Sequence, residues 1–174
     1  MKRLTLLRHA HAKVQAPAVT DFERPLSRRG RAEAKATALR LLKAGAIPQL
    51  LLVSPARRTV QTAEILAGEL QIPERHVRQD EVLYLAAPDT LLKVINATGP
   101  RIEHLMIVGH NPGISALANA LAPQAHLGEL ATAGACTMDF NVPAWSAVTT
   151  GAAENVHAWG SAARLFGLFK QKQS

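Results

Sequence analysis

Short apolar runs of strand length alternate with longer segments of helical periodicity along most of this chain. Strands are expected at residues 2–7, 50–53 and 104–108. The segments between them carry apolar residues three or four positions apart, which is the pattern of an amphipathic helix. Strands that alternate with helices are typical of βαβ units, in which helices cover both faces of a parallel sheet. We therefore expect an α/β fold with three layers, αβα, and a mostly parallel central sheet.

The remaining elements follow from the same periodicity and from capping residues. Helices are expected over residues 28–44, 55–70, 88–97 and 112–121, and further strands at 77–79, 136–140 and 155–158. Ser27 is suited to cap the first helix, and Gly45 is suited to end it. On that helix we expect one apolar face to be buried, formed by Ala32, Ala36, Leu39 and Leu42.

The length and hydrophobicity of the chain favour one domain. At 174 residues and 48% hydrophobic composition, residues 1–174 suit a single domain with its own core. No apolar run approaches the roughly 20 residues that span a bilayer, and the first run is too short for a signal peptide. The single cysteine, Cys136, cannot form an internal disulfide. We expect a cytoplasmic protein with a frayed basic end at residues 170–174.

The net charge of +7 is concentrated near the N-terminus. Residues 1–45 hold eleven Lys and Arg against three Asp and Glu, whereas the rest of the chain holds nine against ten. Such an excess attracts anionic substrates, although solvated side chains on a helix surface also explain many of these residues. Nucleic-acid binding is a weaker interpretation, because the aromatic residues form no cluster on which bases could stack.

Three of the apolar runs end in residues that can hold a phosphate. The first ends in Arg8 and His9, the second leads into Ser54 and Arg58, and the third leads into His110. The carboxyl ends of parallel strands meet at one edge of a sheet, where α/β proteins bind ligands. Arginine offers a planar fork of donors that suits phosphate, and histidine can act as nucleophile, acid or base. The sequence therefore predicts one pocket for phosphoryl chemistry.

Five segments, taken in order, resemble the histidine phosphatase superfamily, also called the phosphoglycerate mutase-like fold. Within it the chain is similar to the short SixA-type phosphohistidine phosphatases. The segments are residues 7–10 (LRHA), 21–30 (DFERPLSRRG), 54–63 (SPARRTVQTA), 108–112 (VGHNP) and 132–134 (TAG). The resemblance covers nearly the whole chain. Ala10 stands where the family motif has glycine, which an alanine can replace if its φ is negative.

The resemblance implies a metal-independent phosphatase in which His9 attacks the phosphoryl group and becomes phosphorylated. Arg8, Arg58 and His110 would surround that group, because fixed cations stabilise the charge that spreads over its oxygens. His9 would be neutral, with its other ring nitrogen donating to a backbone carbonyl. His110 would be protonated and donate to the phosphate. Water would then hydrolyse phospho-His9 without a cofactor or a metal ion.

Four further residues are candidates for the same pocket. Asp21 and Arg24 are candidates for substrate binding, with a surface ion pair as the alternative. Asn111 either binds substrate or caps the helix that follows it. Glu81 is the candidate general acid, with a surface charge at a strand end as the alternative. An imidazole leaving group needs less protonation than an alkoxide, so a weak acid position favours N–P over O–P substrates.

These features together lead us to expect a phosphatase that hydrolyses phosphohistidine on a protein, such as a phosphotransfer protein in signal transduction. One alternative is a small-molecule phosphomonoesterase of the same superfamily. Another is a non-catalytic module that binds phosphate or a phosphoprotein. The resemblance to SixA-type proteins also implies a monomer with a shallow, open site. Neither a membrane nor a nucleic acid is expected as a partner.

Overall fold

The computed structural model describes residues 1–160, which contain one six-stranded sheet with strand order β3-β2-β4-β1-β5-β6. Its strands are β1 (Lys2–Arg8), β2 (Leu50–Val53), β3 (Val77–Gln79), β4 (His104–Gly109), β5 (Ala135–Phe140) and β6 (Glu154–Trp159). The first four are parallel, β5 is antiparallel to β1, and β6 is antiparallel to β5. The sheet is therefore mixed and mostly parallel. The basic end expected to fray, residues 170–174, lies outside the described residues.

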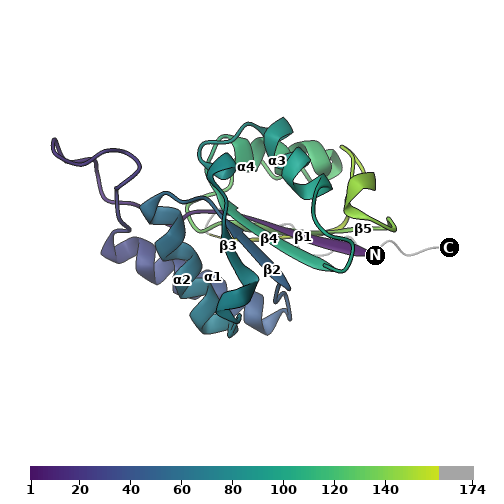
Figure 1. Ribbon diagram of the computed structural model, residues 1–174, viewed down its shortest axis with the longest axis horizontal. Helices are drawn as coiled ribbons and strands as arrows, with labels where there is room; N and C mark the ends of the chain where they lie inside the picture. The colour runs from purple at the N-terminus through teal and green to yellow at the C-terminus, as the bar shows by residue number, and fades with distance from the viewer. Residues whose placement is uncertain (161–174) are drawn as a thin grey trace.

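Pairs of helices cover the two faces of this sheet (Figure 1). On one face α1 (Arg28–Lys43) packs against α2 (Arg57–Leu70), and on the other α3 (Pro88–Asn96) packs against α4 (Gly113–Leu121). Four short 3-10 helices lie in the connections: η1 (Glu74–His76), η2 (Glu81–Leu83), η3 (Pro123–Ala125) and η4 (Trp145–Ala147). No helix within residues 1–160 combines the length and the apolar character that crossing a bilayer requires. The expected three-layer αβα architecture is confirmed.

The central strands are buried on both faces, and their side chains alternate between two hydrophobic cores. On β4, Leu105 and Ile107 join the core beneath α3 and α4, whereas Met106 and Val108 join the core beneath α1 and α2. All four are fully buried. Burying such a side chain stabilises the fold by about 1.5–3 kcal/mol. A strand covered on both sides needs a continuous apolar sequence, which explains why these strands are visible in the sequence.

Helix α1 buries a different face from the one that its apolar pattern indicated. The buried side chains of its inner face are those of Ala34, Thr37, Ala38 and Leu41. Leu39 and Leu42, which belong to the expected face, are 47% and 41% exposed. The prediction of the buried face was therefore wrong, although the helix itself is confirmed.

The rotation of α1 is set at its N-terminus. The Ser27 hydroxyl caps the helix by accepting a hydrogen bond from the Gly30 amide at 3.0 Å. A Cβ on Gly30 would clash with the backbone carbonyl of His11, so only glycine allows this close approach. Because Gly30 faces His11, the residues one and three turns later, Ala34 and Leu41, face inward as well. A local backbone contact therefore outweighs the larger apolar residues on the other face.

Candidate active site

The carboxyl ends of β1, β2 and β4 meet at one edge of the sheet, because β4 lies between the other two strands. This brings His9, Ser54 and His110 together, and Arg58 joins them from the first turn of α2. A cavity of about 620 Å³ opens at this edge. The sequence-predicted residues that line it are Arg8, His9, Asp21, Arg24, Arg58, His110 and Asn111.

Backbone hydrogen bonds fix His9 between three segments. Its amide donates to the Gly109 carbonyl at 3.0 Å, and its carbonyl accepts from the Ala133 amide at 3.1 Å. The next residue, Ala10, is fully buried and donates its amide to the Thr62 hydroxyl at 3.1 Å. The φ of Ala10 is not in the left-handed region, so an alanine fits in place of the family's glycine. The segment 132–134 therefore helps to hold His9 in place.

The His9 ring is neutral and presents a lone pair to the cavity. Its Nδ1 lies 2.8 Å from the Ala10 carbonyl oxygen. A carbonyl oxygen only accepts, so Nδ1 carries the proton and Nε2 does not. Burial, together with the charges of Arg58 and Arg8, lowers the pKa of His9 to about 4. At neutral pH this tautomer leaves Nε2 unprotonated, and its lone pair accepts a hydrogen bond from Arg58 Nε at 3.3 Å, a long contact that an electrophile can replace.

The Arg58 guanidinium lies between the two histidines and a carboxylate. Its side chain is 2% exposed. Nε lies 3.3 Å from His9 Nε2, and Nη2 lies 3.3 Å from His110 Nδ1. On its other side, Nη1 donates to the Asp21 carbonyl at 2.6 Å, and Nη2 donates to Asp21 Oδ2 at 3.0 Å. Asp21 therefore orients Arg58 so that one edge faces both imidazole lone pairs.

His110 is a neutral ring in the free site. Its ring lies with its centroid 5.3 Å from that of His9. Because Arg58 can only donate, His110 Nδ1 accepts, and Nε2–H donates to the Ser54 hydroxyl at 2.7 Å. Burial, followed by the charges of Arg58 and His9, lowers the pKa of His110 to about 3. The free site therefore holds a neutral His110 at physiological pH, and the expectation that a protonated His110 donates to a bound phosphate stays a prediction for the filled site.

Asp21 belongs to the loop between β1 and α1, which projects from the body of the molecule (Figure 1). Besides Arg58, it accepts hydrogen bonds from the Tyr84 hydroxyl at 2.9 Å and from Arg24 Nε at 3.0 Å. Burial opposes ionisation of this carboxyl, but these partners outweigh it and lower its pKa to about 2. Asp21 is therefore a permanent anion whose contacts go to protein donors.

Sequence reasoning placed the general acid at Glu81 and did not select Tyr84. Glu81 is exposed in η2 and is not among the residues that line the cavity. Tyr84, three residues later, packs its ring edge-on to His110 with centroids 5.4 Å apart, and it holds Asp21. The one signal for Tyr84 in the sequence was an aromatic hydroxyl close to a strand end.

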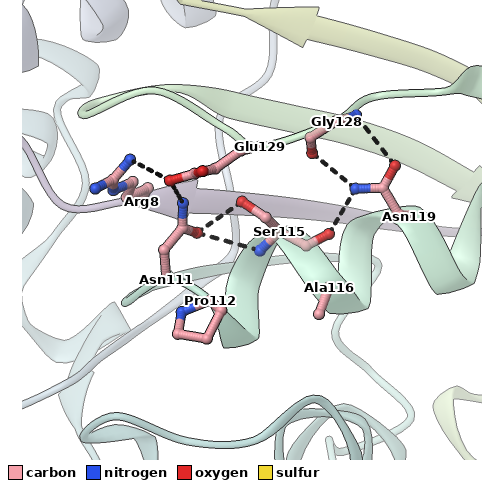
Figure 2. Close-up of a pocket in the computed structure, with 8 residues that line it drawn as sticks. All are labelled: Arg8, Asn111, Pro112, Ser115, Ala116, Asn119, Gly128 and Glu129. Carbon is pink, nitrogen blue, oxygen red and sulfur yellow. Dashed lines mark hydrogen bonds and ion pairs between the residues drawn. The ribbon is translucent and has the colours of Figure 1, made fainter.

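Arg8 and Asn111 also line the catalytic cavity, and both lie beside Glu129 (Figure 2). Both donate to the Leu130 carbonyl, at 2.9 and 3.1 Å, and both donate to Glu129 Oε1 at 3.3 Å. Asn111 Oδ1 also accepts from the Ser115 amide at 3.3 Å, which is a capping contact for α4. The helix-cap alternative for Asn111 is therefore present in the structure. Glu129 was not selected from the sequence, because nothing there indicates its partners.

Arg8 keeps donors that its contacts with Glu129 and Leu130 do not use. Its Nε is buried and has no hydrogen-bond partner among residues 1–160. A buried donor without a partner costs about 1–3 kcal/mol. No group of three or more His, Cys, Asp and Glu residues in the described part of the chain is arranged to hold a metal ion.

Comparison with known proteins places this arrangement in a family. A family model described as the histidine phosphatase superfamily (branch 1) matches residues 4–83. The structure of an Agrobacterium tumefaciens protein assigned as the phosphohistidine phosphatase SixA superposes with a TM-score of 0.74 and 30% identity, covering 80% of this chain and 92% of that one. The fold is also shared with the mycobacterial glucosyl-3-phosphoglycerate phosphatase, with a TM-score of 0.64, 20% identity and coverage of 91% and 98%.

A plant protein is also similar to this chain in sequence. An uncharacterised chloroplastic protein of Arabidopsis thaliana is 35% identical over 129 residues, which are 70% of this chain and 59% of the relative. This chain thus spans less than two thirds of that relative. The mixed αβα fold, the ordered motifs and the similarity to the Agrobacterium structure agree with one another. The chain belongs to the histidine phosphatase superfamily.

Proposed function

We propose that this protein is a phosphatase that hydrolyses phosphohistidine on a protein substrate through a phospho-His9 intermediate. The observation that carries the proposal is the state of His9: a neutral ring that lines the cavity and whose unprotonated Nε2 accepts only a long hydrogen bond, 3.3 Å from Arg58 Nε. A nucleophile needs that lone pair, and the arginine beside it attracts the phosphoryl group to it. Family membership and the similarity to the Agrobacterium protein support the assignment.

In the first step His9 Nε2 forms a bond to phosphorus, and the bond from phosphorus to the substrate's imidazole nitrogen breaks. The bond's electron pair leaves with that imidazole. Arg8 and Arg58 stabilise the charge on the phosphoryl oxygens, as fixed cations do in phosphoryl transfer. A bound phosphoryl dianion also raises the pKa of His110, because an adjacent negative charge favours the protonated ring. His110 then becomes a donor to the phosphoryl group when the site is filled.

In the second step a water molecule attacks phospho-His9. The bond between phosphorus and Nε2 breaks, its electron pair returns to Nε2, and inorganic phosphate leaves with both protons of the water. His9 returns to the neutral ring, with Nδ1–H still donating to the Ala10 carbonyl. The Nδ1 contact keeps the same nitrogen reactive throughout, because a ring flip would break it. Both steps use only the protein's own side chains and water.

The carboxyl groups of the site support an N–P rather than an O–P substrate. Asp21 is the one carboxylate among the described residues that line the cavity, and its pKa of about 2 makes it a poor proton donor at neutral pH. Glu81 lies outside that lining. An alkoxide leaving group needs such a donor, whereas phosphohistidine that carries a proton on its distal nitrogen releases a neutral imidazole. The site is therefore better suited to phosphohistidine than to a sugar phosphate.

One observation favours the second candidate, a small-molecule phosphomonoesterase. The cavity volume of about 620 Å³ is enough for a small phosphate ester. Under that alternative the Tyr84 hydroxyl, which donates to the cavity-lining Asp21 at 2.9 Å, is the candidate proton donor to the leaving group. The two candidates share the His9 step and differ in the group that leaves.

The test compares release of inorganic phosphate from a phosphohistidine protein, an aryl phosphate and a sugar phosphate. We expect kcat/KM to be highest for the phosphohistidine protein, and His9→Ala to lose at least about 10³-fold on every substrate. His126→Ala is the matched control, because His126 lies outside the cavity lining. A preference for the esters would establish the small-molecule alternative. Full activity in His9→Ala would contradict the mechanism. Binding of the phosphoprotein without vanadate-sensitive turnover would indicate a non-catalytic module.

A further inference from the structure

A second cavity, of about 540 Å³, adjoins the catalytic cavity and has no part in the proposed mechanism. It shares Arg8 and Asn111 with the catalytic cavity. Figure 2 shows it between the first two turns of α4 and the segment 128–129. A substrate whose phosphoryl group lies against Arg8 can therefore extend into this second cavity.

The side-chain amides of this cavity are already occupied by protein acceptors (Figure 2). Asn119 Nδ2 donates to the Ser115 and Gly128 carbonyls at 2.8 and 2.7 Å. Asn111 Nδ2 donates to Glu129 and to the Leu130 carbonyl. An amide nitrogen has only two protons to donate, so neither amide has one left for a ligand.

The hydroxyl and the arginine that line the cavity are engaged in the same way. The Ser115 hydroxyl donates to Asn111 Oδ1 at 2.7 Å. Arg8 directs Nη1 to Glu129 Oε1 and to the Leu130 carbonyl. Its remaining donors are the ones that the mechanism assigns to the phosphoryl group. A second anion in this cavity would therefore find few donors to receive it.

Glu129, by contrast, still has a carboxylate oxygen that can accept a hydrogen bond from a ligand. Both contacts of its carboxylate go to Oε1, and Oε2 has no hydrogen-bond partner in the part of the chain that the structure describes. The side chain is 73% exposed and can adjust to a ligand. A carboxylate oxygen without a partner is suited to bind an ammonium or a guanidinium group.

The charges of the two cavities are complementary to a substrate with both signs. The catalytic cavity holds Arg8, Arg24 and Arg58 with Asp21, and the second cavity adds Glu129. When a phosphoryl dianion neutralises Arg8, the repulsion between Arg8 and a cation in the second cavity weakens. Phosphoryl group and cation therefore favour each other's binding.

We propose that the cavity between α4 and Glu129 is a subsite for a lysine or arginine side chain that lies beside the phosphohistidine of the substrate protein. This inference rests on the proposed function and names a feature of its substrate. Glu129 provides the specificity: its carboxylate binds a neighbouring cation and repels a neighbouring carboxylate. Phosphohistidine segments with a basic neighbour are then preferred over acidic ones.

The test uses phosphohistidine peptides that carry lysine, glutamine or glutamate at each of three positions on either side of the phosphohistidine. We expect lysine to give about tenfold higher kcat/KM than glutamine in at least one position, as one charge-assisted hydrogen bond provides. Glutamate at that position should be the poorest. In Glu129→Gln the ratio of lysine to glutamine should fall below about threefold, and Glu129→Lys should reverse the order of lysine and glutamate. Glu64→Gln, an exposed carboxylate on α2, is the matched control and should keep the wild-type ratio.

The outcomes separate this inference from the proposed function. Hydrolysis of all peptides without a lysine preference, or a preference that survives in Glu129→Gln, would overturn the subsite and leave the proposed function standing. Hydrolysis of aryl phosphate but of none of the peptides would overturn both. Ratios are compared within each variant, because Glu129 also contacts Arg8 and its replacement can change the absolute rate.

Discussion

Two of the arginines that line the catalytic cavity each pair with one carboxylate: Arg58 with Asp21, which we call the Arg58 wall, and Arg8 with Glu129 of the adjoining cavity, which we call the Arg8 wall. Arg58 is 2% exposed, and Asp21 contacts it at 2.6 and 3.0 Å through its carbonyl and its carboxylate. Arg8 is 24% exposed, and Glu129 contacts it at 3.3 Å through a carboxylate that is 73% exposed. The Arg58 wall is therefore buried and fixed, whereas the Arg8 wall is open and adjustable.

This difference indicates separate tasks for the two arginines. A fixed charge beside the nucleophile stabilises a transition state without reorganisation when the reaction occurs. An exposed ion pair contributes little to stability, about 0–1 kcal/mol, so its partners can be exchanged for a ligand at small cost. The Arg58 wall is suited to the chemical step, and the Arg8 wall is suited to recognition of the substrate beyond its phosphoryl group.

Replacing the arginines one at a time is the strongest test of this comparison. We expect Arg58→Ala to lower kcat about 10³-fold, because a buried donor next to the reacting atoms is lost. Arg8→Ala should lower kcat/KM about 10²-fold, with a larger share in KM. Arg58→Lys should restore little, since an ammonium cannot face both histidines and Asp21 at once. Steady-state kinetics on an aryl phosphate measure the three variants, and equal losses in kcat would contradict the division of tasks.

The fixed wall also makes the protein sensitive to acid. The pKa values of His9 and His110 are about 4 and about 3 in the folded protein, below the ordinary value of 6.5. Between these values and pH 6.5 the unfolded chain binds protons that the folded protein does not, so stability falls as the pH falls through this window. The expected loss from these two rings between pH 7.5 and pH 4.5 is on the order of 5 kcal/mol.

Urea unfolding at the two pH values measures this loss. His110→Gln should show a smaller difference between the two pH values than the wild type, because one of the buried titrating groups is gone. Burial also lowers the pKa of His104 to about 4, and this residue lies outside the cavity lining. Because His104 is present in both proteins, it contributes the same pH dependence of stability to each. An unchanged pH dependence in His110→Gln would contradict the neutral state assigned to His110.

Removing the charge that orients Arg58 should lower kcat less than removing Arg58 itself. In Asp21→Asn, Arg58 keeps the backbone carbonyl contact but loses the carboxylate, so we expect kcat to fall about 30-fold, near 2 kcal/mol. Asp89→Asn is the matched control, because Asp89 is an exposed residue in the first turn of α3. If Asp21 bound substrate directly, as the sequence left open, KM rather than kcat would change.

The smallest effect is expected at Tyr84. Removing its hydroxyl in Tyr84→Phe takes one of the donors from Asp21 and leaves the ring packed against His110 and Phe22. We expect kcat to fall about threefold, near 0.7 kcal/mol, because Arg58 and Arg24 still hold the Asp21 carboxylate. A much larger loss with aryl phosphate than with a phosphohistidine peptide would instead identify the Tyr84 hydroxyl as a proton donor to the leaving group.

The elements of the fold could be predicted because each depends on local pattern. Strands β1, β2 and β4 are continuous apolar runs, and Ser27 caps α1 as expected. The buried face of α1 could not be predicted, since the contact of Gly30 with His11 joins it to a loop that its own pattern does not contain. Pattern identifies the helix, whereas a contact across the fold decides its rotation.

The same limit applies to the site. Arg8, His9, Arg58 and His110 were selected because they follow strand ends or stand in ordered motifs, and the structure brings all four to one cavity. Tyr84 and Glu129 were not selected, because their partners Asp21 and Arg8 lie 63 and 121 residues away in the chain. Glu81, chosen for its position after a strand, does not line the cavity.

The sequence by itself determined the αβα fold, the family and the four residues at the sheet edge, since these depend on periodicity and on short motifs. Only the tertiary structure decided which carboxylate holds which arginine, that the free His110 is neutral, and that Glu129 borders a second cavity. The physical reason is that protonation and charge pairing depend on burial and on distances of a few ångströms between residues far apart in the chain.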